Sequence, residues 1–216
     1  MIVIFDLDGT LLDTYDLIEK TYCYVLDNYI SEYKYDKSII KTFFGPPLID
    51  TFMWITNNDE KRSQYLVERF HEYNLSHHKD YLKIYPNVYD TLKKLKENGH
   101  SINVFSNKAK EAIILGLKIM GLDQFVSEIV GLEDVINPKP NKEGIEKILN
   151  KINKKEEVIM VGDTYFDILA GKNAKVFTCG VTYAKTSKED FISYGADYII
   201  DDMSELIEIV NNIVRG

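Results

Sequence analysis

Short and nearly continuous apolar runs recur along the chain, and most of them lead into a stretch with helical periodicity. Three of these runs are Met1 to Phe5, Ile102 to Phe105 and Val158 to Val161. Runs of this length and composition are typical of strands in a parallel sheet that is covered by helices on both faces. Because strands and helices alternate up to the end of the chain, the pattern predicts an α/β fold.

After Pro86 the elements can be predicted one by one, and Gly99 ends the first of the helices. The pattern predicts helices over 87–98, 109–120, 142–152, 165–173 and 203–214, and strands over 102–105, 128–131, 158–161, 176–181 and 198–200.

The segment between the first strand and Pro86 follows a different pattern. Its apolar residues recur at helical spacing, as in Tyr22, Val25 and Leu26, and it contains no convincing strand. We therefore expect two domains: an α/β core made of residues 1–13 and 86–216, and an inserted all-helical domain made of residues 14–85.

Two carboxylates follow the first apolar run directly. Asp6 and Asp8 are separated by one residue, and Gly9 allows the backbone to turn so that both side chains face one pocket. Two converging carboxylates suit a divalent cation. An ordinary strand-to-loop turn is the alternative, because Asp, Gly and Thr all favour turns.

Polar residues also follow two later strands and occupy the loop between them. They are Ser106-Asn107-Lys108, Lys139 between two prolines, and Gly162-Asp163-Thr164 with Asp167 one helical turn later. In open α/β sheets ligands bind beyond the carboxyl ends of the strands. The sequence therefore predicts that these segments meet in one pocket.

The composition of the chain argues against two classes of binding partner, nucleic acids and membranes. The 216 residues carry a formal net charge of −8 without a basic cluster, which argues against a nucleic-acid partner. The first apolar stretch is too short for a signal peptide, and no run approaches the roughly 20 residues of a membrane span. We expect a cytoplasmic protein without a membrane partner.

The four polar segments, taken in order, resemble the motifs of the haloacid dehalogenase (HAD) superfamily of phosphotransferases and phosphatases. Asp6 to Thr10 match the first motif, Ser106 the second, Lys139 the third, and Gly162-Asp163-Thr164 with Asp167 the fourth. The resemblance spans nearly the whole chain. It implies a Rossmann-like parallel-sheet HAD core that carries an inserted all-helical cap.

The residue types fit phosphoryl transfer. Asp6 is the candidate nucleophile, because a carboxylate can attack phosphorus and form an aspartyl phosphate. Asp6, the backbone carbonyl of Asp8 and Asp163 form a plausible Mg²⁺ site, and Asp167 would support a metal-bound water. The Asp8 carboxyl would protonate the leaving oxygen and then activate water.

An anionic nucleophile and an anionic substrate repel each other, so the site also needs positive charge and hydrogen-bond donors. The Lys139 ammonium would bridge Asp6 and the phosphoryl group. The Ser106 hydroxyl and the Asn107 backbone amide would bind phosphoryl oxygens. The Lys108 ammonium would add a weaker positive electrostatic field.

The place of the insert, directly after the first motif, resembles the helical cap of the phosphoglycolate phosphatase-like branch, which implies that residues 14–85 select the substrate. Within that branch, several stretches are similar to its pyrophosphatases. Gly45 and Pro46 lie in a rigid turn that could present backbone amides to the substrate, although the same turn would also serve as a helix connector.

We therefore expect a Mg²⁺-dependent phosphatase that hydrolyses a small phosphorylated metabolite, either a phosphoglycolate-type monoester or inorganic pyrophosphate, and that acts as a monomer or homodimer. A phosphomutase of the β-phosphoglucomutase kind would use the same Asp6 and Asp8. A non-catalytic binding protein with the same fold is the third possibility, but such a protein would be expected to lack one of the charged motif residues.

Overall fold

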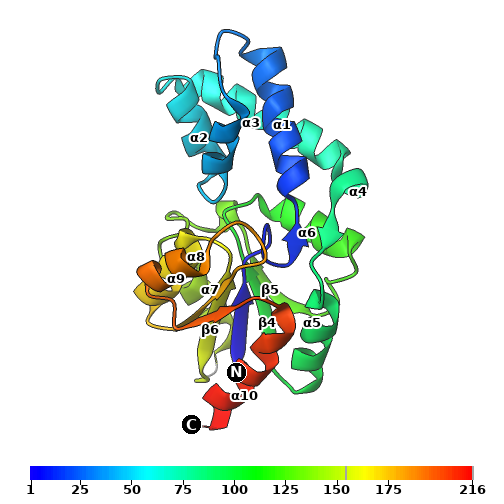
Figure 1. Cartoon of the computed structure of the whole chain (residues 1–216), viewed down its shortest axis with the longest axis vertical. Coiled ribbons are helices and arrows are strands. Elements are labelled where there is room, and N and C mark those ends of the chain that lie inside the picture. Colours follow the sequence, from blue (N-terminus) through cyan, green and yellow to red (C-terminus); the bar gives the residue numbers. More distant parts are fainter. Residues whose placement is uncertain (154, 216) are drawn as a thin grey trace. The chain divides into compact units, whose positions relative to one another are not determined.

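A computed structural model describes residues 1–153 and 155–215, and its largest feature is a six-stranded sheet (Figure 1). The strand order is β5-β4-β1-β6-β7-β8, and every neighbouring pair is parallel. The strands are β1 (Ile2–Phe5), β4 (Ser101–Phe105), β5 (Val126–Val130), β6 (Val158–Gly162), β7 (Phe177–Val181) and β8 (Tyr198–Ile200). The predicted α/β fold with a parallel sheet is confirmed.

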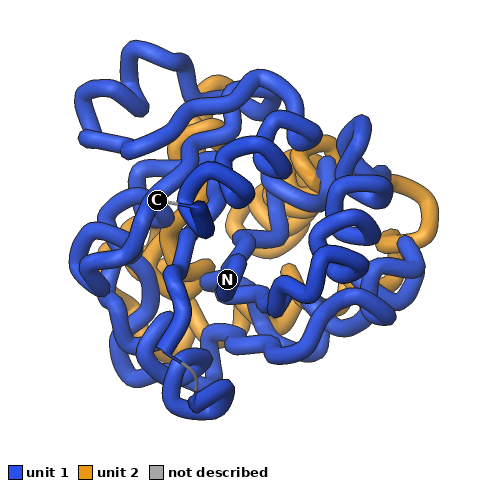
Figure 2. Tube along the Cα trace, turned by 90° about the horizontal axis from the view of Figure 1, so that it is seen from below, with its two compact units in different colours: residues 1–13, 83–216 blue, residues 14–82 orange. Residues whose placement is uncertain are grey.

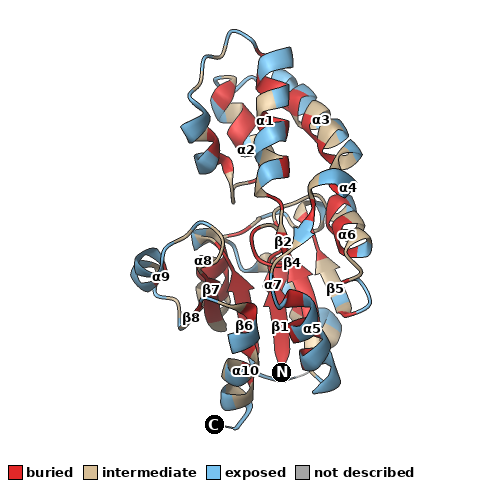
Figure 3. Ribbon diagram, turned by 45° about the vertical axis from the view of Figure 1, so that its right-hand side comes forward, coloured by how far each residue is buried: buried red, intermediate tan, exposed pale blue. Residues whose placement is uncertain are grey.

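Helices cover this sheet. They are α5 (Val88–Glu97), α6 (Lys110–Ile119), α7 (Glu143–Ile152), α8 (Tyr165–Ala174), α9 (Lys188–Tyr194) and α10 (Leu206–Arg215), with 3-10 turns η2 (Leu132–Asp134) and η3 (Met203–Glu205). Residues of α7 and α8 share a hydrophobic cluster with Ile2 and Ile4. Val3 and Phe5 point to the opposite face and are fully buried too, so the central strand is covered on both sides (Figure 3).

The chain forms two compact units (Figure 2). The α/β unit consists of Met1–Asp13 and the chain from Lys83 onward, and the helical unit is Thr14–Leu82. We keep these two names below. No helix in the described ranges has both the length and the apolar composition that crossing a membrane requires.

The helical unit has a hydrophobic core of its own. It consists of α1 (Tyr15–Tyr29), η1 (Lys37–Phe43), α2 (Leu48–Ile55), α3 (Glu60–Ser76) and α4 (His78–Tyr81). The ring of Tyr22 is central, with its centroid 5.1 Å from that of Phe43, 5.8 Å from Phe52 and 4.8 Å from Phe70. Burying these aromatic rings together holds helices that are distant in sequence.

A second, two-stranded sheet joins the points where the chain leaves and re-enters the α/β unit. β2 (Leu12–Asp13) and β3 (Lys83–Ile84) are antiparallel, with Leu12 opposite Ile84. The expectation that residues 14–85 contain no strand is therefore wrong for Lys83–Ile84. The helical unit ends before Lys83. Two residues are too few to show an alternating pattern, and the backbone pairing with β2 provides the strand.

The other differences are small. β5 begins at Val126 where the sequence predicted 128, and the final predicted helix begins as the 3-10 turn η3. Helix α9 was not predicted. Ser187 caps its start by accepting a hydrogen bond from the backbone amide of Asp190, and Gly195, with φ of +76°, ends it.

Candidate active site

The loop that follows β1 places Asp6 at the edge of the sheet. The Asp6 amide donates to the carbonyl of Val161 at 2.9 Å, which continues the pairing between β1 and β6 by one residue. The chain then turns through Gly9, whose φ is +79°, and the Gly9 amide donates to the Leu12 carbonyl at 2.8 Å. Asp6 is consequently fixed and only 7% exposed.

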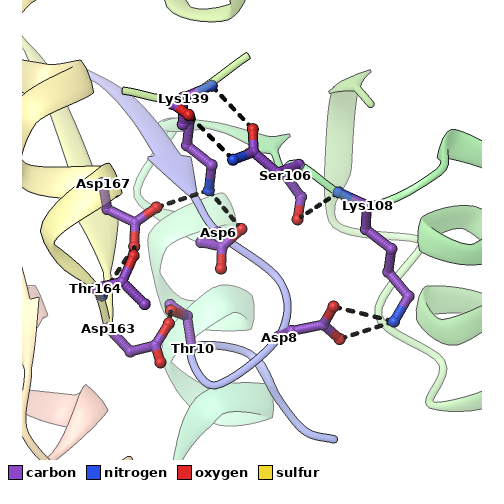
Figure 4. A network of polar contacts seen from close by, with 10 residues as sticks. Asp6, Asp8, Thr10, Ser106, Lys108, Lys139, Asp163, Thr164 and Asp167 are labelled. Atoms are coloured by element: carbon purple, nitrogen blue, oxygen red, sulfur yellow. Dashed lines mark hydrogen bonds and ion pairs between the residues drawn. The ribbon is translucent and has the colours of Figure 1, made fainter. Parts of the chain in front are cut away.

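Three buried carboxylates converge at this edge. One oxygen from each of Asp6, Asp163 and Asp167 lies within 4.8 Å of the others. Asp6 follows β1, Asp163 follows the neighbouring strand β6, and Asp167 lies in the first turn of α8, as Figure 4 shows. The carboxyl ends of two adjacent parallel strands thus bring together residues more than 150 positions apart.

Lys139 lies among these carboxylates. Lys139 Nζ is 2.7 Å from Asp6 Oδ1 and 2.6 Å from Asp167 Oδ1, and the lysine is 3% exposed. Burial alone would lower the pKa of Lys139, but Asp167 and Asp6 outweigh it and hold that pKa above its usual range. Lys139 is therefore a permanently charged ammonium inside the site.

The Asp6 carboxyl has an unusually high pKa. Burial raises the pKa of Asp6 to about 6, and the repulsion of Asp167 adds to the shift while the attraction of Lys139 opposes it. With all groups ionised, three carboxylates face one ammonium. The cluster thus holds more negative charge than its own lysine can neutralise, which is the electrostatic setting of a cation site.

Hydrogen bonds orient the two carboxylates of the fourth motif. Asp167 Oδ2 accepts from the Thr164 amide at 2.9 Å and from the Thr164 hydroxyl at 2.7 Å, which also closes the first turn of α8. Asp163 Oδ1 accepts from the Thr10 hydroxyl at 3.3 Å. Gly162 leaves room for this packing, because a Cβ there would fall 2.2 Å from Asp167 Cγ.

The loop that carries Lys139 is held from both sides. The Asn107 side chain accepts from the Lys139 amide at 2.9 Å and donates to the Lys139 carbonyl at 3.2 Å. Glu143 accepts from the amides of Ile136 and Asn137 at 3.0 and 2.9 Å, and these two amides, together with the side chains of Lys147 and Asn137, lower the pKa of Glu143 to about 2. The side-chain role of Asn107 and the role of Glu143 were not predicted.

The structure does not bring the Asp8 carboxylate into the acidic cluster. Both Asp8 oxygens lie 3.0 Å from Lys108 Nζ, and Figure 4 shows the side chain directed toward Lys108 and away from Asp6. The expectation that Asp6 and Asp8 face one pocket is therefore not met by this arrangement of side chains. The pair is partly exposed to solvent: the Asp8 side chain is 23% exposed and the Lys108 side chain is 12% exposed.

The remaining predicted site residues fall into two groups. Ser106 lies at the end of β4, is 4% exposed, and its hydroxyl accepts from the Lys108 amide at 3.4 Å. Gly45 and Pro46 belong to the helical unit, in the connection between η1 and α2. Their contact with substrate stays a prediction.

Sequence reasoning also missed Thr10 and Thr164 as partners of the acidic cluster. Thr164 could have been found, because a Thr followed three residues later by an acidic residue is a helix-start signature. Thr10 carries no such signal, since its partner Asp163 is 153 residues away.

Comparison with known proteins agrees with this geometry. The sequence signature of the haloacid dehalogenase-like hydrolases matches residues 3–181. The chain is 40% identical to pyrophosphatase PpaX of Listeria monocytogenes over 213 residues, which is 97% of this chain and 96% of that protein. It is also 40% identical to pyrophosphatase PpaX of Halalkalibacterium halodurans over 209 residues, or 96% of this chain and 95% of that protein.

A solved structure gives the same result for the fold. A protein of Clostridium acetobutylicum, described as a predicted phosphatase, superposes with a TM-score of 0.86 at 28% identity, over 98% of both chains. The chain therefore belongs to the haloacid dehalogenase-like hydrolases, as a phosphatase of that superfamily.

Proposed function

We propose that this phosphatase is Mg²⁺-dependent, works through an aspartyl phosphate on Asp6, and acts on a small phosphorylated metabolite, with inorganic pyrophosphate as the leading candidate. The observation that carries the proposal is the buried cluster of Asp6, Asp163 and Asp167 around Lys139. Pyrophosphate leads because two relatives named pyrophosphatase are 40% identical over at least 96% of the chain. A phosphoglycolate-type monoester is the second candidate.

The donor set fits Mg²⁺. The three clustered groups are carboxylates, which are the oxygen ligands that Mg²⁺ prefers, and their excess negative charge suits a divalent cation. Asp6, Asp163 and the backbone carbonyl of Asp8 would hold the ion, and Asp167 would support one of its waters. When bound, Mg²⁺ supplies charge neutralisation for the phosphoryl oxygens.

In the first half of the reaction, a carboxylate oxygen of Asp6 attacks phosphorus while the bond from phosphorus to the leaving oxygen breaks. Lys139 holds Asp6 and stabilises charge on the transferring group. Asp8 gives its proton to the leaving oxygen. Because Asp8 is paired with Lys108 as a carboxylate in the structure, this step requires the Asp8 side chain to take up a proton and to rotate away from that lysine.

In the second half, Asp8 takes a proton from water, the water oxygen attacks the phosphorus of the aspartyl phosphate, and inorganic phosphate leaves as Asp6 is regenerated. The Ser106 hydroxyl binds a phosphoryl oxygen. The Asn107 side chain is committed to the Lys139 main chain, so its backbone amide is the group proposed to contact phosphate.

We assign substrate selection to the helical unit, in the role of a cap domain. Gly45 and Pro46 are the first positions to test, because they lie in the connection between η1 and α2 of this unit. Substitutions there should change the ratio of kcat/KM between substrates and leave Mg²⁺ affinity unaltered. The proposed setting is a cytoplasmic monomer or homodimer without a nucleic-acid or membrane partner.

The test is phosphate release with Mg²⁺ from pyrophosphate, 2-phosphoglycolate, sugar phosphates and nucleoside monophosphates. Asp6→Asn removes the nucleophile with little change in volume, and Asp123→Asn makes the same change at an exposed position. We expect one dominant substrate, no turnover by Asp6→Asn and full activity of Asp123→Asn. Residual turnover by Asp6→Asn at more than about one thousandth of the normal rate contradicts the assigned nucleophile.

A further inference from the structure

The loop that follows β7 contacts two of the loops that build the site. The Tyr183 hydroxyl donates to the Thr10 carbonyl at 2.7 Å. The Thr186 hydroxyl donates to the carbonyl of Asp163. Residues 182–187, here called the 182–187 loop, therefore reach both the loop after β1 and the loop after β6.

The sheet explains why this loop is in reach. β7 is the neighbour of β6, and Gly162 pairs with Gly180, so the loops that follow these two strands leave the same edge of the sheet side by side. The Tyr183 ring packs against Tyr85 with centroids 4.7 Å apart. This tilted packing restricts the ring and aims its hydroxyl at the Thr10 carbonyl.

The contacts converge on one residue, Asp163. Thr186 holds the main chain of Asp163, while Tyr183 holds Thr10, whose hydroxyl donates to Asp163 Oδ1 at 3.3 Å. Asp163 is 1% exposed and would hold the ion in the proposed function. Outer hydrogen bonds of this kind orient a metal-binding side chain and raise its affinity.

We propose that Tyr183 and Thr186 are positioning residues for the metal-binding carboxylate Asp163, an inference that rests on the proposed function. The 182–187 loop sets how tightly Mg²⁺ binds, and it makes no contact with the phosphoryl group. The two hydroxyls act at different points, Thr186 on the main chain of Asp163 and Tyr183 on its side chain through Thr10.

The experiment measures Mg²⁺ binding directly, by titration calorimetry without substrate. Tyr183→Phe and Thr186→Val each remove one hydroxyl from the loop. Tyr85→Phe removes the same atom from the neighbouring ring that packs against Tyr183, and Thr186→Ser keeps the hydroxyl while removing a methyl group. We expect Tyr183→Phe and Thr186→Val to weaken Mg²⁺ binding about tenfold, and the two controls to stay near the wild-type affinity.

A second readout separates positioning from a general loss of stability. At saturating Mg²⁺, the substrate KM of Tyr183→Phe should equal that of the wild type, because only the metal site is affected. The inference is overturned if Tyr183→Phe and Thr186→Val bind Mg²⁺ like the wild type, even when their melting temperatures fall.

The Asp163→Asn variant keeps this inference separable from the proposed function. If the wild type binds Mg²⁺, Asp163→Asn does not, and the loop variants bind normally, the metal site stands and the role of the loop is wrong. If the wild type binds no Mg²⁺, the metal site itself is wrong and the loop's role falls with it.

Discussion

Gly9 lies directly against the carboxylate of Asp163. A Cβ on Gly9 would fall 2.2 Å from Asp163 Oδ2, and the φ of Gly9 is +79°. The carboxylate therefore occupies the space that any other residue would need for its side chain. This contact joins the loop after β1 to the loop after β6, and it makes a glycine part of the proposed metal site without any ligand atom of its own.

The first prediction concerns that glycine. Gly9→Ala should displace Asp163 and lower Mg²⁺ affinity and kcat/KM at least about tenfold, because the new methyl group overlaps a ligand. Gly99→Ala is the matched control, since Gly99 has φ of +83° with no atom within 4 Å of the position of its Cβ. It should lose about 1 kcal/mol of stability and keep full activity. Equal Mg²⁺ affinities in the two variants would contradict the assigned contact.

The second prediction compares the two lysine–aspartate pairs of the site. Lys139→Met leaves three buried carboxylates without a cation, so the metal-free protein should lose about 3–5 kcal/mol of its free energy of unfolding. Lys108→Met breaks the more open pair with Asp8 and should cost about 1 kcal/mol. Urea denaturation in the presence of a chelator measures both. A larger loss in Lys108→Met than in Lys139→Met would refute the ranking by burial.

The third prediction concerns pH. The pKa of Asp6 is raised from 3.8 to about 6 in the folded, metal-free protein, so the native state binds a proton more tightly than the unfolded chain. The stability contributed by Asp6 therefore falls as pH rises from about 4 to about 6 and stays low above that range. Asp6→Asn removes this loss. The free energy of unfolding of Asp6→Asn should exceed that of the wild type by about 1–3 kcal/mol at neutral pH, and this difference should vanish near pH 4.

Denaturation curves of the two proteins between about pH 4 and pH 7, in the presence of chelator, provide this measurement. Titrating groups far from Asp6 contribute almost equally to both proteins and cancel in the difference. A difference in free energy of unfolding that does not change with pH would show that the pKa of Asp6 is not raised.

The fourth prediction tests Asp8. Asp8→Asn cannot protonate a leaving oxygen or activate water, so pyrophosphate turnover should fall by at least about a hundredfold. p-Nitrophenyl phosphate has a leaving group that needs no proton. The variant should therefore release a burst of about one equivalent of p-nitrophenol and then stall with Asp6 phosphorylated. Rapid-mixing kinetics detects the burst, and steady turnover without one would show that Asp8 is not needed to clear the intermediate.

Much of the fold and the centre of the site follow from the sequence, for a physical reason. A parallel sheet buried on both faces needs continuous apolar strands, and these are visible in Ile2–Phe5, Ser101–Phe105 and Val158–Gly162. Since the carboxyl ends of such strands share one edge, placing Asp6 and Asp163 together required no knowledge of side-chain conformations, and the motif resemblance added Lys139. The structure brings these three side chains into one cluster.

The details that were missed depend on contacts between segments distant in sequence. The pairing of Asp8 with Lys108 joins two loops 100 positions apart, and nothing in either loop specifies it. The strand Lys83–Ile84 exists only because Leu12–Asp13 lies beside it. Helix α9 did carry local signals in Ser187 and Gly195, but Phe191 is its one buried residue, so it shows no apolar periodicity.

The pairing of β2 with β3 has a consequence for how this chain can change over evolutionary time. Leu12 and Ile84 are opposite partners, so the chain leaves the α/β unit and re-enters it at neighbouring points, as at the two ends of a hairpin loop. A short turn could connect Asp13 to Lys83 directly. The segment between Asp13 and Lys83 can therefore be lengthened, replaced or deleted as one unit, while Asp6, Lys139 and Asp163 keep their positions.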